Sequence, residues 1–76
     1  MPPFPVISGK RLGRILERLG WVFHHQRGSH AIYYHGEYNI EVSVPMHKEL
    51  KEGTLRTIIR QARLTRDEFI KLNSET

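Results

Sequence analysis

Hydrophobic residues in the first third of the chain recur with the period of an α-helix. Between residues 9 and 20 they fall on one stripe of the helix surface: Leu12, Ile15, Leu16 and Leu19. Ser8 precedes this stripe and belongs to the residue types that cap helix N-termini, and Gly20 follows it, where glycine commonly ends a helix. The pattern predicts a helix over residues 9–20 with one apolar face.

Strand-like segments fill the middle of the chain. Residues 21–26 are rich in aromatic side chains, residues 30–35 combine isoleucine with tyrosine, and residues 38–44 alternate apolar and polar positions. Residues 35–37 predict a tight hairpin turn, and Pro45, which lacks an N–H, is expected to end the third strand. Because the connections are short, the three strands are expected to pair as an antiparallel meander.

The second strand leaves open which face of the sheet carries His30. Positions of one parity hold His30, Ile32 and Tyr34, and neither parity is cleanly polar. A β-bulge after Gly28 would remove this conflict.

Two further helices are predicted after the strands. The first is expected to be capped by Thr54, and its apolar stripe repeats the spacing of the N-terminal helix: Leu55, Ile58, Ile59 and Ala62. The second is short and begins at Thr65, where Thr65 and Glu68 form a capping box and Leu64 and Phe69 form a hydrophobic staple.

The element order is helix, three strands, helix and short helix, which is an α+β arrangement. Helices with one apolar stripe each must bury it against the apolar face of the sheet, so the opposite face is expected to stay open. A chain of 76 residues is expected to form one domain over residues 1–76. We expect residues 1–6 and 73–76 to be loosely held ends.

Composition excludes several classes of protein. The chain has no cysteine, which rules out disulfides, a thiolate zinc site and a cysteine nucleophile, and makes a reducing compartment natural. No segment approaches the ~18 consecutive apolar residues of a membrane span, and the N-terminus lacks the apolar run of a signal peptide. We therefore expect a cytoplasmic protein without a membrane partner.

Basic residues are concentrated in two regions, the first third of the chain and the segment after the strands. The formal net charge is +4, from 12 lysines and arginines against 8 acidic residues. The two regions hold Lys10, Arg11, Arg14, Arg18 and Arg27, then Lys48, Lys51, Arg56, Arg60 and Arg63. Such a surface suits a polyanion such as nucleic acid, although a solvated basic surface without a partner has the same composition.

A histidine supplies the candidate chemistry. Gly28-Ser29-His30 lies between two predicted strands, which holds His30 on a rigid element close to a loop. The unperturbed pKa of histidine lies near neutrality, so it can accept and donate protons. RNA carries its own nucleophile, the 2′-hydroxyl, and an enzyme needs only to move that proton and stabilise charge on the phosphate. The alternative is a structural strand histidine held by a backbone hydrogen bond.

The remaining histidines do not predict a metal site. His24 and His25 are adjacent, and neighbours on a regular strand point to opposite faces. His30, His35 and His47 lack the spacing of metal ligands. The glycines form no phosphate-binding loop either. We expect no metal and no cofactor.

Four motifs carry a family resemblance. They are Leu19-Gly20-Trp21, Arg27-Gly28-Ser29-His30, Val44-Pro45-Met46-His47-Lys48 and Leu50-Lys51-Glu52-Gly53-Thr54-Leu55-Arg56. With these motifs at this spacing, residues 8–72 resemble the HicA toxin family of bacterial and archaeal type II toxin–antitoxin systems.

The resemblance implies a double-stranded-RNA-binding-like fold and a toxin that cleaves mRNA independently of the ribosome. It implies that His30 is catalytic, because it occupies the histidine of the family's G-S-H motif. His47 lies on a second family motif and is either a helper or a structural residue, and Ser29 is a further candidate helper. The resemblance also implies a HicB-like antitoxin protein that binds the toxin and covers the site.

The basic residues predicted to contact RNA phosphates are, first, Lys10, Arg27 and Lys48, and then Arg11 and Arg14.

Two other classes of function stay open. A non-catalytic RNA-binding module would recognise duplex RNA by its shape, and a protein-interaction domain would use the open edge of the sheet. Cleavage of single-stranded mRNA separates the nuclease from both.

Overall fold

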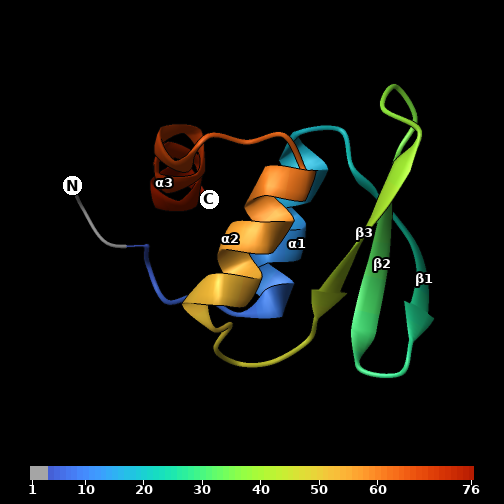
Figure 1. Ribbon diagram of the computed structural model, residues 1–76, viewed down its shortest axis with the longest axis horizontal. Coiled ribbons are helices and arrows are strands. Elements are labelled where there is room, and N and C mark those ends of the chain that lie inside the picture. Colours follow the sequence, from blue (N-terminus) through green and yellow to red (C-terminus); the bar gives the residue numbers. More distant parts are fainter. Residues whose placement is uncertain (1–3) are drawn as a thin grey trace.

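The computed structural model describes residues 4–76 (Figure 1). The elements are α1 (Gly9–Arg18), β1 (Val22–Arg27), β2 (His30–His35), β3 (Ile40–Pro45), α2 (Glu52–Gln61) and α3 (Arg66–Glu75). The strands form one antiparallel sheet in the order β1-β2-β3, and α1 and α2 lie side by side on one of its faces. This open-faced α+β arrangement is the predicted fold, and it agrees with a double-stranded-RNA-binding-like architecture.

Both predicted signals at the ends of α1 are confirmed, although the helix ends at residue 18 and not at residue 20. The side chain of Ser8 accepts a backbone N–H from the first turn. At the other end Gly20 has a φ of 93°. Its N–H donates to the carbonyl of Glu17, and the N–H of Trp21 donates to that of Leu16. These two bonds form a Schellman motif, in which glycine adopts the left-handed conformation at low cost.

The connection between β2 and β3 is longer than the predicted turn at residues 35–37. It comprises residues 36–39, because His35 and Ile40 are the last paired residues. Asn39 has a φ of 56°, and its N–H donates to the carbonyl of His35 at 2.8 Å. Asparagine tolerates this conformation better than other non-glycine residues, which explains why the loop closes there. Pro45 is the last residue of β3, as predicted.

A β-bulge lies in β1, and not after Gly28, where a bulge would have removed the conflict over the face of His30. Phe23 pairs with Tyr33 of β2, and His25 pairs with the residue just before Tyr33. His24 is therefore the extra residue of β1. The pairing of β2 with β3 shows no such shift.

The unbroken pairing of β2 with β3 decides the face on which His30 lies. Ala31 and Tyr33 are buried in the hydrophobic core beneath the helices, whereas His30 is exposed. Because side chains alternate along a strand, His30 lies with Ile32 and Tyr34 on the face that the helices leave open.

The second helix begins before its predicted cap. Lys51 is the N-cap of α2 and makes no side-chain capping bond, and Thr54 lies inside the first turn. The acidic Glu52 at the first helical position favours this earlier start, because a negative charge is stabilised at a helix N-terminus. The start of α3 is confirmed, since Thr65 and Glu68 form the complete capping box.

Long-range contacts hold the described ends of the chain, which were expected to be loose. Residues 73–75 belong to α3, and Nε of Arg11 donates to Oδ1 of Asn73 at 2.6 Å. The ring of Phe4 packs against Phe69, with 6.1 Å between the ring centroids. The partners in these contacts lie some 60 positions apart in the chain, so no local pattern predicts them. Loose ends stay a prediction for residues 4–6 and 73–76, and residues 1–3 fall outside the described residues.

The core lies between the sheet and the helices. Its largest fully buried side chains are Trp21, Phe69, Leu12, Ile15, Leu16, Leu55, Val42 and Val44. Among residues 4–76, no helix has the length and apolar character needed to cross a membrane.

Candidate functional site

The turn between β1 and β2 brings two of the predicted site residues together. Arg27 ends β1 and pairs with His30, which begins β2, and directly opposed residues lie on the same face of a sheet. Both side chains are exposed. Together with Glu41 of β3 they line a cavity of about 290 Å³ on the open face of the sheet.

His30 also lines a second, larger cavity of about 660 Å³. Its other walls come from Ser43 and Pro45 of β3, from Lys51, and from α2 along its length between Gly53 and Gln61. The first backbone N–H groups of a helix have no partner within the helix, and they give its N-terminus a partial positive charge. His30 lines both cavities and so lies where they meet. The cation of Arg27 lines one of them, and that of Lys51 lines the other.

Sequence reasoning missed Lys51 as a site residue. The residue was noted only as part of a motif and of a basic region, because its distance from His30 depends on how α2 packs against β3. The signal that could have found it is its position at the start of α2, directly before the acidic first turn.

A backbone hydrogen bond joins two of the sequence motifs. The N–H of Met46, just after β3, donates to the carbonyl of Ser29 at 2.7 Å. The segment that carries His47 and Lys48 is thereby fixed beside the turn that carries His30. Ser29 takes part in this contact through its backbone, and its side chain is exposed.

The start of α1 packs closely against the same segment. The N–H of Gly9 donates to the carbonyl of His47 at 2.9 Å. A Cβ atom at Gly9 would lie only 1.9 Å from the carbonyl oxygen of Pro45, so no larger residue fits this approach. As a result Lys10, His47 and Lys48 line one cavity of about 300 Å³.

The predicted site residues thus fall into separate groups. Arg27 and His30 share the cavity on the open face, whereas Lys10, His47 and Lys48 share the one at the start of α1. The other two predicted cations belong to neither lining. Arg14 is exposed on α1, and the guanidinium of Arg11 donates to Asn73 and to the backbone carbonyl of Thr76.

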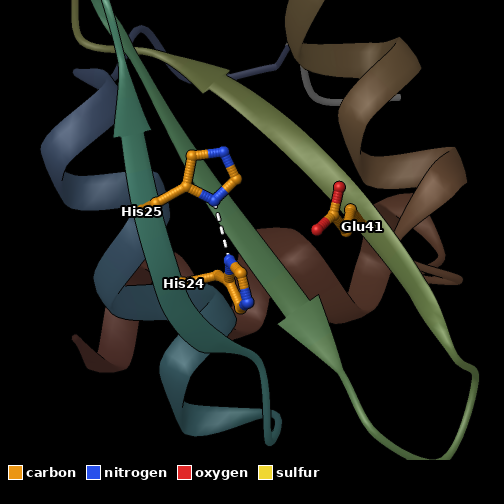
Figure 2. Close-up of side chains that lie close together, drawn as sticks. All are labelled: His24, His25 and Glu41. Carbon is orange, nitrogen blue, oxygen red and sulfur yellow. Dashed lines mark hydrogen bonds between the residues drawn. The ribbon is translucent and has the colours of Figure 1, made fainter.

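The bulge in β1 brings His24 and His25 together on one side of the sheet. Their Nδ1 atoms are 2.7 Å apart, as the dashed line in Figure 2 shows. The expectation that adjacent histidines would point to opposite faces was wrong, because the extra residue interrupts the alternation of the strand. Figure 2 also shows the carboxylate of Glu41 directed from β3 toward the two rings.

His35 is a structural histidine. Its ring is buried, stacks on Tyr38 with 4.2 Å between the ring centroids, and meets the edge of Trp21. Its Nε2 lies 3.2 Å from the carbonyl oxygen of Leu19, which can only accept a hydrogen bond. Nε2 therefore carries the proton, and the ring ties the end of α1 to β2.

One family model matches the chain. Residues 9–64 match the model described as the HicA toxin of bacterial toxin-antitoxin systems. No curated protein matches the chain. The matched range runs from the first residue of α1 to beyond the end of α2, and it contains every residue of the predicted site.

Proposed function

The chain belongs to the HicA toxin family, and we propose that it is an mRNA interferase, an endoribonuclease that cleaves mRNA independently of the ribosome with His30 as its catalytic histidine. Membership makes it the toxin of a toxin–antitoxin pair. The nuclease activity and the role of His30 are the proposal.

The observation that supports this proposal best is the position of His30. The residue is exposed at the junction of two cavities, and each cavity has one cation in its lining, Arg27 or Lys51. A purely structural histidine would be expected in a setting like that of His35, which is buried and bonded to a carbonyl.

The chemistry requires little more than these groups. The 2′-hydroxyl of RNA is a nucleophile adjacent to the phosphate that it attacks, so catalysis needs a proton acceptor or donor there. His30 supplies that function as general base or general acid. The cations stabilise the charge that develops on the phosphate oxygens in the transition state.

Phosphates flanking the cleaved bond would meet the other basic groups. Lys10 and Lys48 line the cavity at the start of α1, and Met46 and Ser29 link this segment to the turn of His30. We propose that Lys10, Arg27, Lys48 and Lys51 contact the RNA backbone. Arg11 is left out of this set because its guanidinium is engaged with α3.

The antitoxin partner is proposed to be a HicB-like protein that covers His30. Acidic groups on such a partner would complement the basic surface, which mainly directs and accelerates association. Covering the cavities at His30 would exclude RNA and so restrain the toxin.

The test of this function uses the purified chain and a single-stranded mRNA without ribosomes. Appearance of defined RNA fragments, without added metal and in the presence of a chelator, supports the interferase. A salt-dependent shift of the RNA in a gel without fragments would contradict it and favour the non-catalytic RNA-binding module.

A further inference from the structure

Three potential metal ligands meet on the open face of the sheet. The bulge at His24 turns two consecutive histidines toward the same region, and Glu41 reaches it from β3 across the intervening strand. One ligand atom from each of the three residues lies within 4.8 Å of the other two. None of the three is fully buried, so an ion could reach them from solvent.

Imidazole nitrogens and a carboxylate oxygen are the ligands of many zinc sites. Zinc accepts this donor set in a tetrahedral arrangement, and three protein ligands leave the fourth position to water. We propose that His24, His25 and Glu41 form a binding site for a divalent transition-metal ion, with zinc as the ion that fits the donors best.

The side chains must move little to hold the ion. Two nitrogens on one tetrahedral zinc are about 3.3 Å apart, given bonds of ~2.0–2.1 Å. The Nδ1 atoms of His24 and His25 lie 2.7 Å apart, a distance at which they share a hydrogen. Binding therefore replaces that hydrogen with the ion, while the rings separate slightly and Glu41 closes from its side.

Arg27 opposes the ion. Its Nη2 lies 3.5 Å from Nε2 of His25, and a guanidinium can only donate, so Nε2 accepts and Nδ1 carries the proton. Coordination through Nδ1 moves that proton to Nε2, which then faces the donors of Arg27. The bound ion therefore disfavours the present position of Arg27. Since Arg27 lines the cavity of His30, an ion would also rearrange that cavity.

Calorimetric titration of the untagged chain with zinc chloride at pH 7.5 tests the site. We expect one ion to bind per chain, and His24→Gln and His25→Gln each to weaken it by more than the ~10-fold that loss of a supporting residue commonly costs. Glu41→Gln should also weaken it. His47→Gln is the matched control, because it removes an exposed histidine outside the cluster and should leave zinc affinity unchanged.

Two further measurements locate the bound zinc ion. Zinc should shift the ring NMR signals of His24 and His25 and leave those of His47 in place, and Arg27→Gln should tighten binding. The proposal is overturned if no saturable binding is seen at zinc concentrations up to about 1 mM, where a dissociation constant corresponds to only about 4 kcal/mol of binding free energy. Equal affinities in His24→Gln, His25→Gln and the native chain would overturn it as well. Neither outcome depends on whether the protein cleaves RNA.

Discussion

Arg27 and Lys51 each line one of the two cavities at His30, and their charges should determine how RNA phosphates are held. We predict that Arg27→Gln, Lys51→Gln, Lys10→Gln and Lys48→Gln each weaken RNA binding for all sequences alike. Each lost phosphate contact should lower the slope of log affinity against log salt by ~0.7 for a single strand. The measurement is a salt series of binding isotherms on the His30→Ala protein, so that RNA stays intact.

Lys71→Gln provides the matched control, because it removes one exposed positive charge from α3 and Lys71 lines none of the three cavities described above. Its salt slope should equal that of the unchanged protein. If all four site variants also keep that slope, the assigned phosphate contacts are wrong.

Some site residues could be predicted from the sequence and others could not. His30 was predicted as the candidate catalytic residue because it belongs to a local sequence motif. The positions of Lys51 and of the pair His24 and His25 depend on packing and on strand register. Neither is encoded by spacing along one segment, and the prediction missed the first and misplaced the second.

At the scale of the elements, the capping box of α3 links stability to pH. The backbone N–H of Thr65 donates to Oε1 of Glu68 at 2.9 Å, and this bond, with a second contribution from the Thr65 side chain, lowers the pKa of Glu68 below its usual 4.5. The charged carboxylate is thus favoured in the folded state. Its contribution to stability is present above pH 4.5 and is lost as the pH falls through the lowered value.

This effect is tested by measuring the free energy of unfolding of Glu68→Gln and of the unchanged chain by urea denaturation between pH 3 and pH 7. Glutamine keeps an oxygen that can accept the Thr65 N–H but does not titrate, so the native chain should lose more stability on acidification than the variant. Parallel pH profiles for the two proteins would show that the capping box does not titrate with folding.

Elements were predicted well where the signals were local and agreed with one another. The box at Thr65 and the Schellman end at Gly20 both involve residues within one turn. The predicted start of α2 was wrong because threonine is a preferred N-cap residue and lysine is not, which favoured Thr54 over Lys51. The sequence does not reveal that the helix already begins at Glu52. The bulge in β1 is a property of two paired strands, so the sequence of one strand does not reveal it.

On the scale of the whole molecule, the sheet presents one face that the helices leave uncovered (Figure 1). His30 and Arg27 line a cavity on this face. Contacts between distant segments complete the fold on the other side, where Arg11 bonds Asn73 and Phe4 packs on Phe69. These contacts pair the two ends of the chain, which local patterns do not report. The predicted order of layers nevertheless held, because each amphipathic helix had only one apolar face to bury.

The uncovered face gives a prediction for the antitoxin complex. Coexpression with a HicB-like protein should yield a complex in which His30 is protected from diethyl pyrocarbonate and mRNA stays intact. Lys71 on α3 serves as the internal control, since its reactivity toward an acylating reagent should be unchanged. A complex that cleaves mRNA at the rate of the free toxin, with His30 still reactive, would rule out inhibition by covering the site.

The central claim is that His30 transfers the proton during RNA cleavage. The most direct measurement compares the rate of mRNA cleavage by the native chain and by His30→Ala, after both proteins give the same circular dichroism spectrum and cooperative melting. Because His30 is exposed, the substitution should leave the fold intact, while the loss of one acid–base group should slow cleavage by ~10²–10⁴-fold. Cleavage by folded His30→Ala at the native rate would contradict the account.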